Sequence, residues 1–136
     1  MSSMHRTIEG NVLVRHLVRD ELLINQHLVA RHGRSGRTLV KEGPLRVTLM
    51  ALDADGSLPT HSTTGPVTVH MLEGTIEFHA LGLSYLLQAG DLLALAPGVL
   101  HGATSLTGGL FLLTVVHDPS GGSRAASDAA AAPRPV

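Results

Sequence analysis

The middle of the chain alternates short apolar segments with residues that favour turns. Leu45–Leu52 lies between Gly43-Pro44 and the polar residues 53–56, and residues 67–72 form a second apolar run that ends at Glu73-Gly74. Runs of this kind bounded by Gly, Pro and Asp predict β-strands. Further strands are predicted at residues 75–80, 84–88, 92–95, 101–105 and 110–116. Short, evenly spaced strands are typical of an antiparallel sandwich or barrel.

The two ends of the chain differ from this middle part. Residues 12–32 have a mixed pattern that predicts an amphipathic helix, with two short strands as the alternative. Residues 31–37 form a basic, glycine-containing segment that predicts a solvated loop. Residues 119–136 are small, polar and proline-containing, which predicts a loose tail. We therefore expect an N-terminal extension at residues 1–37, a barrel at 38–118 and a disordered tail at 119–136.

Charge and length exclude several classes of protein. The chain has 136 residues, with 10 Lys and Arg against 11 Asp and Glu. It is therefore expected to form one domain without the basic surface that nucleic acid binding needs. Its apolar runs are too short to span a membrane, and its first residues lack the apolar stretch of a secretory signal, so a cytoplasmic location is expected. The absence of cysteine excludes disulfides and thiolate metal sites.

Histidine is the one chemically active residue type that is abundant. There are nine histidines, whereas aromatic residues make up only 2% of the chain. Imidazole is the commonest metal ligand in proteins and titrates near neutral pH, so this composition raises metal binding or acid-base chemistry as hypotheses. His79 shares a strand face with polar residues and His117 ends a strand beside the tail, so both are predicted to lie on the surface.

Two segments resemble the sequence motifs of the cupin superfamily, whose members are small jelly-roll β-barrels. Residues 56–74 read GSLPTHSTTGPVTVHMLEG, and residues 90–101 read GDLLALAPGVLH. The resemblance extends over about residues 45–116. It implies an all-β, antiparallel jelly-roll barrel, with an N-terminal extension that is helical or extended. The positions that match the motifs are Gly74, Gly90, Asp91, Pro97, Gly98 and His101, together with His61 as the first histidine.

The metal ligands that the cupin motifs imply are only half present. His61 and His101 stand at two of the four ligand positions, but Thr63 replaces the second histidine and Val67 replaces the glutamate. Valine has no donor atom, and a hydroxyl is a weak ligand for a transition metal compared with imidazole or carboxylate. The resemblance therefore implies an incomplete site that holds either no metal or one divalent transition metal ion.

His70 is a candidate third ligand on one condition. Side chains of a strand alternate between its two faces, so His70 points away from the face that carries Val67. It reaches the site only if Gly65-Pro66 forms a bulge that shifts the register of the strand.

The motifs and the reduced ligand set are compatible with three functions. The first is a cupin that binds a small molecule inside its barrel. The second is a metal-dependent enzyme, such as an oxygenase or isomerase, that uses His61 and His101. The third is a sensory or structural cupin that acts as a homodimer through its strand edges or through residues 13–29. The pocket predicted for the first function is lined by His61, Thr63, Val67, Val69, Met71, Leu93, Leu95 and His101.

Overall fold

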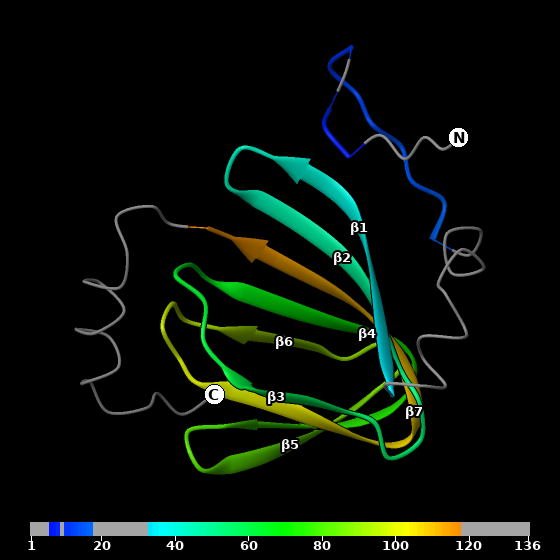
Figure 1. Ribbon diagram of the computed structural model, residues 1–136, viewed down its shortest axis with the longest axis vertical. Coiled ribbons are helices and arrows are strands. Elements are labelled where there is room, and N and C mark those ends of the chain that lie inside the picture. The colour runs from blue at the N-terminus through cyan, green and yellow to red at the C-terminus, as the bar shows by residue number, and fades with distance from the viewer. Residues whose placement is uncertain (1–5, 9, 18–32, 118–136) are drawn as a thin grey trace.

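The computed structural model describes residues 6–8, 10–17 and 33–117, and these residues contain seven antiparallel strands (Figure 1). All seven belong to one hydrogen-bonded network in which the path is β1-β2-β7-β4-β5, with β3 paired to β7 and β6 paired to β4. The strands are β1 (Arg34–Glu42), β2 (Leu45–Leu52), β3 (Ser57–His61), β4 (Val67–Ala80), β5 (Leu83–Gln88), β6 (Leu92–Leu95) and β7 (His101–Val116).

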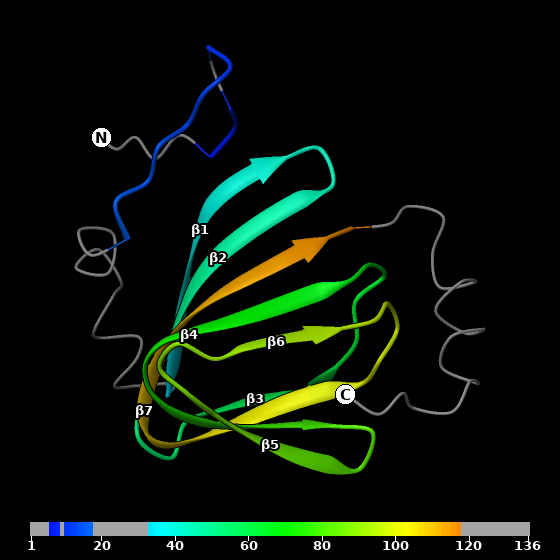
Figure 2. The same cartoon turned by 180° about the vertical axis from the view of Figure 1, so that it is seen from behind.

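The network folds into two facing layers because β4 and β7 each contribute to both. In the first layer, the first half of β4 pairs with β6 and with the second half of β7, which in turn pairs with β2. In the second layer, the second half of β4 pairs with β5 and with the first half of β7, which also pairs with β3. Figures 1 and 2 show the two groups of strands diverging from the bend that β4 and β7 share. This is the expected antiparallel jelly roll.

Glycines permit the shared bend. The pairing of β4 with β7 shifts register on both sides of Gly74, which has a φ of 80°, and Gly108 opposite has a φ of 90°. Side chains are disfavoured at such angles. A Cβ atom on Gly74 would also lie within 3.0 Å of the backbone of Gly108 and Gly109. Bulges of this kind bend a strand and increase its twist, so both strands turn at one point.

The main core fills the space between the two layers. Its largest fully buried side chains include Phe78 and Phe111, which come from different strands and different layers. Alternation places every second residue of β4 in this core, from Val67 to Met71 before the bend and from Ile76 to Phe78 after it. The buried members are Leu52, Val67, Val69, Met71, Ile76, Phe78, Leu87, Ala103, Phe111 and Val115.

A second apolar cluster lies on the other face of the first layer and contains residues that alternate along the strands with those of the main core. Leu49 and Leu110 are buried with Leu39, and Leu17 of the N-terminal segment packs against them. The N-terminal residues also continue the sheet, because the Arg6 carbonyl accepts a hydrogen bond from Lys41 N–H at 2.6 Å. The N-terminal segment therefore covers part of the strand layer of its own chain.

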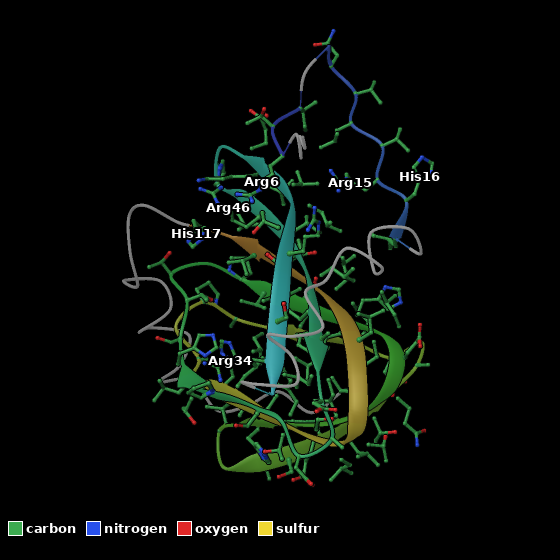
Figure 3. All side chains as sticks on the ribbon, turned by 45° about the vertical axis from the view of Figure 1, so that its right-hand side comes forward. Arg6, Arg15, His16, Arg34, Arg46 and His117 are labelled. Carbon is green, nitrogen blue, oxygen red and sulfur yellow. The ribbon has the colours of Figure 1, made fainter. Side chains whose placement is uncertain are left out.

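One end of this layer gathers cationic side chains. Arg46 pairs across the strands with Lys41, and the N–H of His117 donates to the Pro44 carbonyl in the adjacent turn. Figure 3 shows Arg6, Arg46 and His117 at this end of the layer. The Arg46 guanidinium donates to the carbonyl of Gly43 at 2.6 Å, which ties it to the β1–β2 turn.

The predicted strands agree with the structure in position, but the predicted breaks at Gly74 and Gly108-Gly109 are wrong. Both lie inside continuous strands, β4 and β7, because the glycines form bulges at the bend and not chain-reversing turns. Residues 34–37 were predicted as a loop and instead begin β1, where they pair with residues 49–52. The apolar pattern did not predict β3, in which four of five residues are exposed and which contains Pro59.

The N-terminal prediction falls only partly within the described residues. Residues 12–16 have no regular secondary structure, so the helix predicted from residue 12 does not begin there. Residues 18–32 and 118–136, including the predicted tail, lie outside the described residues. Within the described ranges, no helix is long and apolar enough to cross a membrane.

We expect Gly74→Ala to destabilise the protein much more than Gly82→Ala. Gly82 has a similar φ of 75° but nothing lies within 4 Å of its added Cβ, so its substitution should cost only the backbone term, about 1 kcal/mol. Gly74→Ala adds a steric clash with the opposite strand and should cost about 3 kcal/mol. Urea unfolding of both variants measures the difference. Equal losses would show that the close approach of the strands is not the constraint.

Candidate functional site

His61 and His101 lie side by side in the second layer. His61 ends β3 and His101 begins β7, and the two residues are direct partners in the antiparallel pairing of these strands. Their ring centroids are 4.3 Å apart, with the ring planes inclined by 57°. The structure thus brings together the two motif histidines, which are 40 positions apart in the sequence.

Each histidine is held by a carbonyl two residues before it. The Nδ1 atom of His61 lies 2.8 Å from the Pro59 carbonyl oxygen, and that of His101 lies 2.8 Å from the Val99 carbonyl oxygen. Because a carbonyl oxygen can only accept, Nδ1 carries the hydrogen in both rings. In the neutral rings Nε2 is then the nitrogen with a free lone pair, available to accept a hydrogen bond or to bind a metal ion.

The two histidines differ in their surroundings. His101 is only 3% exposed and stacks on Phe78, with centroids 5.7 Å apart and planes inclined by 14°, whereas His61 is exposed. Burial is the main cause that lowers the pKa of His101; the Val99 hydrogen bond opposes this, and the proximity of His61 lowers the pKa further. His101 is therefore favoured in its neutral form, while His61 faces solvent.

The residues at the other two motif positions do not contribute ligands of the expected kind. Thr63 donates its hydroxyl hydrogen to the Gly65 carbonyl at 2.9 Å, and its own carbonyl accepts from Gly98 N–H at 2.9 Å. It therefore braces the loop between β3 and β4. Val67 is 1% exposed within the main core. Within the described ranges, no group of three or more His, Cys, Asp or Glu residues is placed to hold a metal ion.

The apolar residues predicted to line a pocket are divided between core and periphery. Val69 and Met71 are fully buried and packed in the main core, whereas Leu93 and Leu95 are partly buried and pack against it. Side chains therefore already fill the inner part of the predicted lining.

His70 is on the other side of the first layer. It is exposed, pairs with Leu92 and Leu112, and alternates with the buried Val69 and Met71. The condition for its role was a shift of register caused by Gly65-Pro66, but β4 starts with Val67 buried and alternates regularly to Met71, so His70 stays on the face opposite Val67.

Two features of the site were missed in the sequence. The carbonyls of Pro59 and Val99 orient the rings, and Phe78 stacks on His101. The alternation of residues in β4 indicates that Phe78 points inward. It does not show that His101 is its neighbour, because β4 and β7 meet only in the tertiary structure. Backbone carbonyls carry no sequence signal of their own.

Comparison with known proteins identifies the fold. No family model matches the chain, and neither does any curated protein. A solved RmlC-like cupin from Shewanella frigidimarina is 24% identical, covers 65% of this chain and 79% of its own, and superposes with a TM-score of 0.61. A cupin-2 domain protein from the same species is 18% identical, with coverages of 76% and 95% and a TM-score of 0.63. This chain has the cupin fold.

A further cupin-fold match has no assigned function. A conserved protein of unknown function from Streptococcus pyogenes is 23% identical, covers 87% of this chain and 96% of its own, and has a TM-score of 0.62. At these identities the likeness establishes the fold, and the chemistry has to be argued from the residues of this chain. The histidine pair, the Thr63 brace and the buried Val67 are therefore the observations from which function is argued.

We expect the burial of His101 to make the stability of this protein depend on pH. The folded-state pKa of His101 lies below its usual value of 6.5, so the folded protein binds fewer protons than the unfolded chain at mildly acidic pH. Stability should then be complete above about 6.5 and should fall as the pH decreases toward the folded-state pKa. Chemical unfolding across this range measures the effect.

His101→Phe is the informative variant, because it keeps a ring on Phe78 but removes the titration. Its stability should fall less with decreasing pH than that of the native protein. The exposed His70→Gln variant should retain the native pH dependence. A His101→Phe variant with the native dependence would assign the effect to other groups.

Proposed function

We propose that this cupin binds a small molecule at the His61–His101 pair and that the two rings act as hydrogen-bond acceptors for the ligand's polar group. The observation that carries the proposal is the pair of Nδ1 hydrogen bonds to backbone carbonyls. Rings held in this way present their Nε2 lone pairs without further rearrangement, and a ligand gains affinity from groups that are already oriented.

The protonation state favours a ligand with a donor group. Burial keeps His101 neutral, so its Nε2 accepts and does not donate. Two neighbouring acceptors suit a hydroxyl-bearing molecule, such as a diol or a sugar, better than a carboxylate. The exposure of His61 leaves the pair open to solvent on one side.

The surroundings of the pair supply apolar contact. Phe78, which stacks on His101, is a buried member of the main core, and Leu58, which pairs with Ala103 in β7, packs against the same core. Pockets for small molecules are mostly apolar with a few polar groups that fix orientation, and this combination supports the proposal.

A tightly held metal ion does not fit the residues present. Two imidazoles are suitable donors, but the Thr63 hydroxyl is engaged with Gly65, and Val67 has no donor atom. The described residues supply no third His, Cys, Asp or Glu at the pair. A site with two protein ligands binds weakly, so the alternative of a metal-dependent oxygenase or isomerase has less support.

We expect this cupin, purified without a histidine tag, to carry far less than one equivalent of transition metal. Elemental mass spectrometry measures the content, and the His61→Ala, His101→Ala double variant is the control, with circular dichroism to verify that it folds. Near-stoichiometric metal that disappears in a folded double variant would overturn the proposal in favour of the metal-dependent enzyme.

We expect hydroxyl-bearing molecules to stabilise the protein through the pair. A thermal-shift series with glucose, glycerol and ethylene glycol measures the increase in melting temperature, at low millimolar concentrations where these molecules do not stabilise proteins by exclusion from the surface. Any increase should be lost in His61→Ala, whose side chain is exposed and not required for the core, and should persist in the matched variant His70→Ala. An increase that survives His61→Ala would place the binding elsewhere on the protein.

A further inference from the structure

A groove lies outside the barrel, at the turn between β4 and β5 and the loop that precedes β7. Its volume is about 480 Å³, within the range of roughly 300 to 1,000 Å³ that is usual for small-molecule sites. The residues of its lining that bear on ligand binding are Thr60, His79, Ala80, Leu81, Val99 and Leu100.

Neither histidine of the pair lines the groove, although Thr60 beside His61 and Val99, whose carbonyl contacts His101, both do. His79 pairs with Gly102 and alternates along β4 with the buried Phe78 and Ala80, so its side chain lies on the outer face. Thr60 covers the same glycine, because its hydroxyl oxygen lies 3.2 Å from the position of a Cβ on Gly102. His79 and Thr60 thus mark a polar side of the groove on the outer face.

The polar side of the groove combines a basic side chain, His79, with an acidic one, Glu77. His79 Nε2 lies 3.7 Å from a carboxylate oxygen of Glu77, so any positive charge on the ring has a counter-charge beside it. Among the residues that the structure describes, no Lys or Arg side chain lines the groove. The groove therefore has no excess positive charge to attract an anion, and Glu77 would oppose one.

The ring of His79 is held but leaves one nitrogen accessible. Its Nδ1 lies 3.1 Å from the Ser84 hydroxyl, whereas Nε2 makes only a long contact of 3.4 Å with the Thr104 hydroxyl. With a side-chain exposure of 42%, the ring can exchange this weak contact for one with a ligand. The hydroxyl of Thr60 offers a ligand a second polar group beside His79.

The remaining lining is apolar and open. Leu81 is 61% exposed and Leu100 is 60% exposed, both unusually high for leucine side chains that line one groove. Covering them with an apolar ligand surface would contribute about 25 cal/mol for each square ångström removed from water.

From these observations we infer a second ligand site in this groove, for a neutral amphipathic molecule of about one ring in size. Its hydroxyl group bonds to Thr60 and His79, and its apolar body lies on Leu81 and Leu100. The site is independent of the function proposed for the barrel, since its ligand contacts neither His61 nor His101.

Fluorine NMR with 4-fluorophenol as the probe tests this site on the full chain. Titration with protein should shift or broaden the fluorine signal to saturation. 4-Fluorobenzoate has the same ring but is an anion at neutral pH, and it should bind more weakly. Leu100→Asp should weaken 4-fluorophenol binding about tenfold, because it replaces apolar contact with a charge.

Three matched variants make the result specific. Leu106→Asp introduces the same charge at another exposed leucine, outside the groove, and should leave the affinity unchanged. Thr60→Val removes one hydroxyl with little change of shape and should weaken binding, whereas the exposed His70→Gln, outside the groove, should not. The inference is overturned if binding does not saturate, if Leu100→Asp and Leu106→Asp behave alike, if Thr60→Val and His70→Gln behave alike, or if 4-fluorobenzoate binds as tightly as 4-fluorophenol.

Discussion

The fold depends on the close approach of β4 and β7 at their shared bend. The two strands cross from one layer to the other where Gly74 faces Gly108 and Gly109, and a side chain on Gly74 would collide with the opposite backbone. Each strand therefore pairs with different neighbours before and after the bend. Without this crossing, the chain would form one extended sheet with both faces exposed. The two-layer core with Phe78 and Phe111 is a consequence of it.

The candidate site is assembled by strand pairing within the second layer, on one side of this crossing. β7 begins in one layer and ends in the other, and its first residue, His101, meets His61 at the end of β3. The rings are then oriented by local contacts, since each Nδ1 bonds to the carbonyl two residues earlier. The distance between the rings is set by long-range strand pairing, whereas their tautomers are set by short-range hydrogen bonds. A substitution that disturbs the strand pairing would therefore change the distance between the rings, whereas one that disturbs the carbonyl hydrogen bonds would change their tautomers.

This chain has the glycines and turns of the cupin motifs, but Thr63 and Val67 stand at two of the four positions that the motifs assign to metal ligands. Gly90 and Gly98 retain the positive φ angles of turns, and they contribute to the fold whether or not a ligand is bound. Val67, by contrast, has joined the apolar core. A barrel can therefore keep its architecture after losing ligand residues, because the packing and the pairing of strands do not depend on a metal ion.

The sequence by itself determined the fold class, the positions of the central strands and the absence of a histidine or carboxylate at Thr63 and Val67. These properties reside in local patterns: the alternation in β4, the turn residues beside β2 and β6, and the identities of Thr63 and Val67. Only the tertiary structure decided that β4 and β7 continue through their glycines, that residues 34–37 and Ser57–His61 are strands, and that His61 touches His101. Strand formation at exposed or glycine-containing positions depends on partners distant in sequence, and local patterns carry no information about those partners.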